Sequence, residues 1–243
     1  YMPGSTPEPG PGVLVVAGNE AGKLPARISE ADRLAATRLT VSGELNGTDI
    51  VFIRGMFENG KLTDLDMENA TIVSGGDAYS TTPDFVTKDR VVSQYLFEDC
   101  RQMISVKLPA NTVKIESGAF AGCKSLKRLD IPAACVEVER FMASRCDNLE
   151  EISLSDSVRT FPGLAVYLCK NLVRITAGEG NPCFKSVDGV LYSKDGAALV
   201  RYPMGKSGEA YSIPQGVTVI GKDAFSGAQF ASVDIPNTVR TIE

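Results

Sequence analysis

The chain has 243 residues, a net charge of −5 and 43% hydrophobic residues, enough to build an ordinary core for one or two domains. The acidic balance and the lack of a basic run argue against nucleic-acid binding. No apolar stretch reaches the roughly 18 to 20 residues of a membrane span. The chain contains no histidine, which excludes catalytic and metal sites built on that residue. We therefore expect no catalysis, metal or cofactor.

Residues 1–12 mix four prolines with glycines and polar residues. This composition predicts an extended, disordered tether, which would serve as a spacer from an anchor. No signal peptide is visible in the sequence.

Residues 13–90 show helical and strand patterns without a regular period and predict an N-terminal cap followed by irregular repeats. The helix over 24–35, with Pro25 near its start, is the candidate for the cap that covers the first coil. The predicted elements are a helix over 24–35, a strand over 39–43, a helix from Thr48 or Asp49 through Phe57, and a strand over 62–67. The segment Gly18 to Leu24 has the look of a phosphate loop but is one residue short, and Leu24 stands where the motif requires Ser or Thr.

Four cysteines recur every 23 residues, at Cys100, Cys123, Cys146 and Cys169. An apolar residue follows each of them three positions later, and the first three units then read L-x-x-L-x-L. A proline follows this strand pattern at Pro109 and Pro132, and again at Pro214 and Pro236. A fixed period of this length indicates a solenoid, in which each coil buries its apolar face against its neighbours. A cysteine in the tight corner of a coil acts as a small hydrophobic residue, so we expect buried free thiols rather than redox or metal-binding groups.

The pattern L-x-x-L-x-L-P, then I, then A-F-x-x-C, resembles the BspA-like leucine-rich repeats of bacterial surface proteins over residues 91–243. The resemblance implies an α/β-type leucine-rich-repeat solenoid, mostly β with short parallel strands. It also implies a secreted or lipid-anchored protein with an adhesin-like surface.

Two insertions interrupt the period. Residues 74–90 are polar and rich in turn formers, which predicts an exposed loop. The second insertion spans 178–212, and within it Asp188-Gly189 and Asp195-Gly196 separate three apolar runs. These turns predict an antiparallel meander over 184–203 that projects from the solenoid. Members of the family that the chain resembles often carry a similar D-G-V-L-Y segment.

We expect an extracellular protein-binding module, with a host or neighbouring-cell surface protein as its partner. A structural spacer and a carbohydrate-binding protein are the alternatives. No outward strand position is aromatic, which argues against sugar binding. The last coil has no cap after Ile242, so we expect either further chain or self-association through this edge. The predicted partner-binding residues are charged outward strand positions, three of each sign: Lys107, Arg128, Asp130, Glu151, Arg174 and Asp234.

Overall fold

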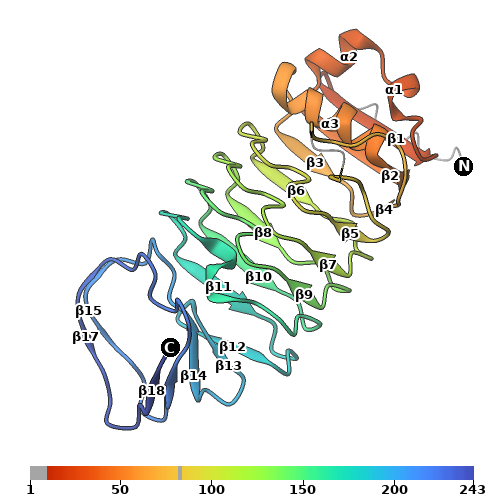
Figure 1. The fold of residues 1–243 in the computed structure, drawn as a ribbon. Helices are drawn as coiled ribbons and strands as arrows, with labels where there is room; N and C mark the ends of the chain where they lie inside the picture. The colour runs from red at the N-terminus through yellow and green to blue at the C-terminus, as the bar shows by residue number, and fades with distance from the viewer. Residues whose placement is uncertain (1–9, 82–83) are drawn as a thin grey trace, which may run out of the picture.

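In the computed structural model, which describes residues 10–81 and 84–243, the chain is an elongated stack of coils with its α-helices gathered at the N-terminal end (Figure 1). Residues 1–9, most of the predicted tether, lie outside the described residues. The stack confirms the predicted leucine-rich-repeat solenoid with short parallel strands.

The N-terminal coils share one sheet, in the order β1-β2-β3-β6, with β4 paired to the far end of β2. Every pairing in this sheet is parallel. The strand β1 was not predicted, and it forms the outer edge of the stack. The strands are β1 (Val13–Asn19), β2 (Arg38–Leu45), β3 (Asp64–Asp66), β4 (Ala70–Ile72) and β6 (Ser105–Lys107).

The predicted helix over 24–35 is broken into α1 (Leu24–Arg27) and α2 (Glu30–Ala35). The break lies at Ile28, whose backbone is extended (φ −122°, ψ 124°) and whose side chain is buried. Ser29 then starts a new helix, because its hydroxyl accepts a hydrogen bond from the Asp32 amide at 3.1 Å. The apolar spacing alone predicts one continuous helix, but the cap at Ser29 divides it into two.

Helix α3 (Gly47–Asn59) is capped by Asn46, two residues before Thr48 and three before Asp49, the two predicted caps. The Asn46 side chain accepts from the Thr48 amide at 3.1 Å, and the Asn46 amide donates to the Asp49 carboxylate at 2.9 Å. Within residues 10–81 and 84–243, no helix combines the length and the apolar character that a bilayer crossing requires.

The buried carboxylate of Asp49 binds the backbone of residues 18–24, the segment whose sequence is similar to a phosphate loop. It accepts hydrogen bonds from the backbone amides of Gly22, at 2.6 Å, and Leu24, at 2.9 Å. These two amides therefore already donate to an internal carboxylate and are not free to bind a phosphate.

The regular coils stack through two parallel sheets, one on each side (Figure 1). In the first sheet Leu129, Ile152 and Ile175 lie directly opposite one another, one period apart, and all three are fully buried. The sheets contain β8 (Arg128–Asp130), β10 (Glu151–Leu154) and β11 (Arg174–Ala177) on one side, and β5 (Val91–Val92), β7 (Lys114–Ile115) and β9 (Glu137–Val138) on the other.

Each of the four corners carries its cysteine, but the predicted phenylalanine is present only in the first two, and Ala143 and Val166 take its place in the third and fourth. In the fourth coil a 3-10 helix (Gly163–Val166) leads into the corner. The rings of Phe97 and Phe120 stack with centroids 5.7 Å apart. All four repeated cysteines are free and buried, as predicted. Most of these coils turn through two left-handed residues, such as Gly118 (φ +69°) and Gly122 (φ +73°).

The two Asp-Gly turns are confirmed: they join β12, β13 and β14 into an antiparallel meander. Its position differs from the prediction, because β14 pairs in parallel with β16 and Leu191 is fully buried. The meander is thus built into the stack instead of projecting from it. The strands of this region are β12 (Phe184–Val187), β13 (Val190–Ser193), β14 (Ala198–Arg201), β15 (Gly208–Ser212), β16 (Val219–Ile220), β17 (Phe230–Asp234) and β18 (Thr241–Ile242).

The inserted loop over 74–90 is mostly exposed among its described residues, with two exceptions. Tyr79 is 6% exposed and Thr87 is 1% exposed. The hydroxyl of Tyr79 donates to the carbonyl oxygen of Gln94 at 2.6 Å, and burial raises the pKa of Tyr79 to about 12. The buried side chain of Tyr79 therefore connects the loop to the first regular coil.

Candidate partner-binding surface

The predicted partner-binding residues on the strand face are largely paired with one another. Glu151, on β10, lies directly opposite Arg128 on β8 and Arg174 on β11. Its carboxylate is 3.2 Å from Arg128 Nη1 and 3.1 Å from Arg174 Nη2. Arg128 Nε also contacts the Asp130 carboxylate at 2.8 Å. Opposite charges at facing positions stabilise neighbouring strands, so this ladder contributes to the stack itself.

The remaining two predicted residues lie outside that ladder. Lys107 Nζ contacts the carboxylates of Asp66 at 3.2 Å and Glu68 at 3.6 Å. Asp234 belongs to the separate two-stranded sheet of β15 and β17, where it accepts from the hydroxyl of Ser212 at 2.8 Å. The structure therefore brings together four of the six residues, as internal pairs.

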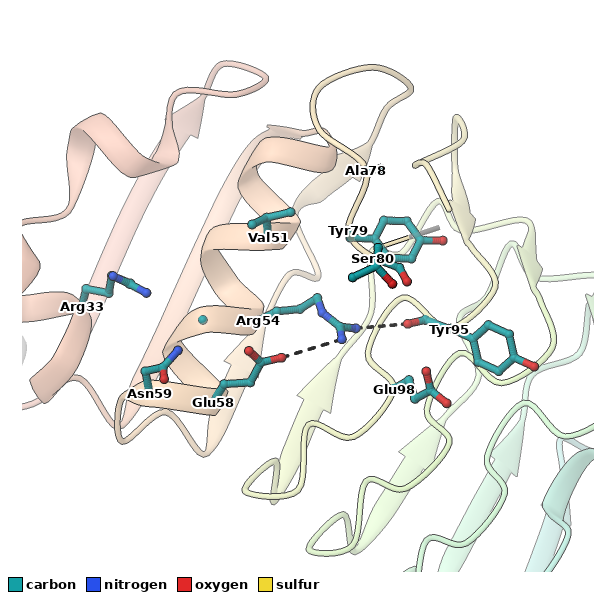
Figure 2. Close-up of a pocket in the computed structure, with 12 residues that line it drawn as sticks. Arg33, Val51, Arg54, Glu58, Asn59, Ala78, Tyr79, Ser80, Tyr95 and Glu98 are labelled. Carbon is teal, nitrogen blue, oxygen red and sulfur yellow. Dashed lines mark hydrogen bonds and ion pairs between the residues drawn. The ribbon is translucent and has the colours of Figure 1, made fainter. Parts of the chain in front are cut away.

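A second surface follows the Phe and Cys corners of the coils, and we call it the corner groove. It consists of two hollows, of about 610 Å³ and about 450 Å³, that share Tyr95 and Glu98. The first hollow lies between α3, the loop around Tyr79 and the first regular coil (Figure 2). The second extends from the first regular coil over the following three, as far as Tyr167. The groove therefore runs from the helical end onto the repeats.

Arg54, on α3, fixes the geometry of the first hollow (Figure 2). Its Nη1 donates to the carbonyl oxygens of Tyr95, at 3.1 Å, and Leu96, at 2.8 Å. Its Nη2 lies 3.8 Å from the Glu58 carboxylate. These bonds join the helical unit to the first regular coil and hold Tyr95 where the two hollows meet.

The second hollow is lined by three aromatic residues, Tyr95, Phe141 and Tyr167. Phe141 and Tyr167 meet edge to face, with centroids 5.8 Å apart. The ring of Tyr95 lies over Gly118, where any Cβ would clash with it. Tyr95 and Phe141 occupy the same corner position two coils apart, and the glycine between them leaves room for the hollow.

Charged residues surround these rings. Arg101, Lys124 and Arg145 line the second hollow together with Glu98 and Asp99. Burial, and then the neighbouring charge of Asp99, raises the pKa of Glu98. Aromatic rings beside arginines are the side chains that contribute most energy to protein interfaces. The groove therefore has the composition of a binding surface.

Our sequence reasoning missed the corner groove because it examined aromatic residues only at strand positions. A signal was present: Tyr95 and Phe141 stand two 23-residue periods apart, with Gly118 midway. A comparison of every position of the 23-residue repeat, and not only of the apolar positions, would have placed both rings on one face. The contribution of α3 and of Tyr79 lies outside the repeat and had no comparable signal.

Comparison with known folds gives two solved structures that share the overall architecture. The chain is similar to the pneumococcal vaccine antigen PcpA, with a TM-score of 0.56 and 20% identity over 88% of this chain and 49% of that one. It is also similar to a leucine-rich repeat protein from Eubacterium ventriosum, with a TM-score of 0.52 and 20% identity over 95% of this chain and 57% of that one. The chain thus spans about half the length of these proteins, and the likeness concerns the fold alone.

No relative was found among curated protein sequences. A family model does match: six copies of the BspA type leucine-rich repeat region cover residues 90–186 and 204–243, more than half of the chain. These ranges include every coil with the cysteine corner, which is the part of the sequence that carries the repeat. The chain belongs to the family of BspA-type leucine-rich repeat proteins.

Proposed function

We propose that this chain is a protein-binding module of a bacterial cell-surface protein and that it binds its partner through the corner groove. The observation that carries the proposal is the second hollow, where three aromatic rings and three cations surround a depression of about 450 Å³. The module has an adhesin-like role and performs no catalysis. Residues 1–12 would connect it to an anchor on the cell.

The energetics of interfaces favour the groove over the strand face. Buried aromatic and arginine side chains at the centre of an interface typically contribute about 2 kcal/mol or more each. On the strand face a partner would first have to separate Glu151 from its two arginines, and it would regain only a similar interaction. The strand face stays a second prediction, with Lys107, Arg128, Asp130, Glu151, Arg174 and Asp234 as its contacts.

Two alternative functions follow from the same architecture. A spacer would need no binding surface, and a carbohydrate-binding protein would also use exposed aromatic rings. The absence of aromatic residues from the strand face does not extend to the corner groove, where Phe141 is 36% exposed. Protein binding is favoured because charged residues outnumber the rings in the lining of the second hollow.

Photo-cross-linking on intact cells tests the proposal. The purified chain would carry benzoylphenylalanine in place of Phe141, in place of Lys107 on the strand face, or in place of Lys23, which lies outside both surfaces. Incubated with intact epithelial cells and with intact bacteria, the variant at position 141 should form a discrete protein adduct and the variant at position 23 none. An adduct from position 107 alone would assign binding to the strand face. If none of the three variants forms a protein adduct, the chain acts as a structural spacer and the proposal is wrong.

A further inference from the structure

We propose that the second hollow of the corner groove takes an acidic segment of the partner protein, which places a carboxylate against Arg145 and an apolar or aromatic side chain against Phe141 and Tyr167. This inference rests on the proposed function and specifies the chemistry of its partner. It is argued from the charges of the residues that line the hollow and from the exposure of Phe141.

The lining of the hollow is cationic although the chain as a whole is acidic. Three cations, Arg101, Lys124 and Arg145, face two carboxylates, whereas the whole chain carries a net charge of −5. Arg101 is neutralised by Asp99 at 3.2 Å. Lys124 reaches Asp147 only at 3.9 Å. The local field therefore favours an anion, against the overall charge.

Of the three cations that line the hollow, Arg145 is the one that forms no ion pair with the residues that the structure describes. Among the described residues, no carboxylate or carbonyl oxygen accepts a hydrogen bond from its side chain. Its backbone is nevertheless fixed, because its amide donates to the carbonyl oxygen of Tyr167 at 2.8 Å. Its φ of +57° is a conformation that non-glycine residues adopt rarely and at a cost. An exposed, unpaired guanidinium in the same lining as aromatic rings is suited to bind a carboxylate in two-pronged fashion.

The aromatic part of the hollow supplies the apolar half of the site. The Arg140 guanidinium lies 5.5 Å from the centroid of Phe141 and 3.9 Å from the Asp223 carboxylate, so this cation contacts the ring but is already paired. Phe141 is 36% exposed and Tyr167 is half-buried. A partner residue that covers Phe141 would exclude water from the contact between Arg145 and the incoming carboxylate, and that contact strengthens as water leaves.

Selection from a phage-displayed library of random twelve-residue peptides tests this inference on the whole chain. Peptides retained by the wild-type chain should be rich in Asp and Glu and should contain an apolar or aromatic residue. Synthetic versions, measured by fluorescence polarisation, should bind Arg145→Glu and Tyr167→Ala at least tenfold more weakly. Arg145→Lys, which keeps the charge but loses the two-pronged geometry, should bind more weakly than the wild type and more tightly than Arg145→Glu. Lys23→Glu, which changes the net charge by the same amount as Arg145→Glu, should bind like the wild type.

Three outcomes would overturn the inference: no peptide is enriched, the enriched peptides are neutral or basic, or Arg145→Glu binds them as tightly as the wild type. Thermal melts of each variant show whether the fold is intact. If Arg145→Glu is misfolded, Arg145→Ala is measured instead. Binding of a sulfated or sialylated glycan that Arg145→Glu abolishes would assign the hollow to acidic sugars instead. If cross-linking at position 141 succeeds while acidic peptides fail, the inference falls and the proposed function stands.

Discussion

The thiol of Cys146 donates a hydrogen bond to the backbone carbonyl oxygen of Phe120 in the preceding coil, with Sγ and O 3.1 Å apart. The same bond joins Cys123 to Phe97 at 3.1 Å and Cys169 to Ala143 at 2.8 Å. Three of the four corner cysteines, Cys123, Cys146 and Cys169, thus connect their coil to the previous one through a buried polar contact. This explains why the corner uses cysteine, which is small and apolar and also carries a weak donor.

The buried thiols predict a clear difference between native and unfolded protein in a thiol titration. The thiolate is the reactive form, and burial raises the pKa of Cys100 to about 12 and that of Cys135 to about 11. With Ellman's reagent near pH 8, Cys183 alone, which is half-buried, should react in the native chain. All six cysteines should react after denaturation.

The variant Cys183→Ser provides the control, since it should abolish the native reaction and leave five reactive thiols after unfolding. A denatured chain without reactive thiols would mean that the cysteines form disulfides. Rapid reaction of several thiols in the native chain would mean that the coils open.

The left-handed turn at Gly118 predicts a loss of stability on substitution by alanine. Its φ of +69° disfavours any side chain, and a Cβ would run into the ring of Tyr95. We expect Gly118→Ala to lower the free energy of unfolding by about 2 kcal/mol, partly from backbone strain and partly from overpacking. Urea denaturation followed by circular dichroism measures this change.

The matched control is Gly208→Ala, at an exposed glycine with ordinary space around it and no positive φ. It should change stability by no more than about 0.5 kcal/mol. Because Gly118→Ala displaces Tyr95 from the junction of the two hollows, it should also weaken any ligand of the corner groove. Equal stability of the two variants would contradict the packing described here.

Arg54 predicts a local effect, since it connects α3 to the first regular coil. Its guanidinium donates to the carbonyl oxygens of Tyr95 and Leu96, and its side chain is 16% exposed. Arg54→Ala would leave both carbonyl groups without this donor, which costs about 2 kcal/mol for hydrogen bonds to a charged group. Hydrogen exchange should speed up in the amides of residues 91–115 before it does in later coils.

Arg101→Ala is the comparison for Arg54→Ala. Its side chain is 65% exposed and contacts a carboxylate that is itself exposed, so its removal should be nearly neutral. If both arginine variants exchange like the wild type, α3 and the repeats are held together mainly by apolar packing and not by Arg54.

The repeat period accounts for what could be predicted and for what could not. Positions 23 residues apart face each other, so the contact of Glu151 with Arg128 and Arg174 could have been read from the sequence. The break between α1 and α2 depends on one side-chain hydrogen bond from the Asp32 amide to Ser29, against an unbroken apolar pattern. The meander could be predicted from its turns, but its pairing of β14 with β16 is a long-range contact that the local sequence does not encode.

The corner groove shows the same limit in a functional setting. Tyr95 can be placed in its coil from the period alone. That its ring covers Gly118, and that Arg54 holds its carbonyl oxygen from a helix 41 residues earlier, depends on how two separate units pack. Sites formed between a repeat and its flanking unit therefore emerge only in the three-dimensional structure.

The last prediction separates the two candidate surfaces by exchanging the charges of Arg128 and Glu151. The double variant Arg128→Glu with Glu151→Arg keeps one facing ion pair but places the new arginine opposite Arg174, so its stability should fall by roughly 1 kcal/mol or less. A partner that binds the strand face should lose about 1 kcal/mol or more of affinity, because each charge it meets is reversed. A partner that binds the corner groove should be unaffected by the exchange and should be lost with Tyr167→Ala.

Affinity for the cross-linked partner, measured by surface plasmon resonance with both variants side by side, decides between the surfaces. Loss of binding in the exchange variant alone would move the site to the strands.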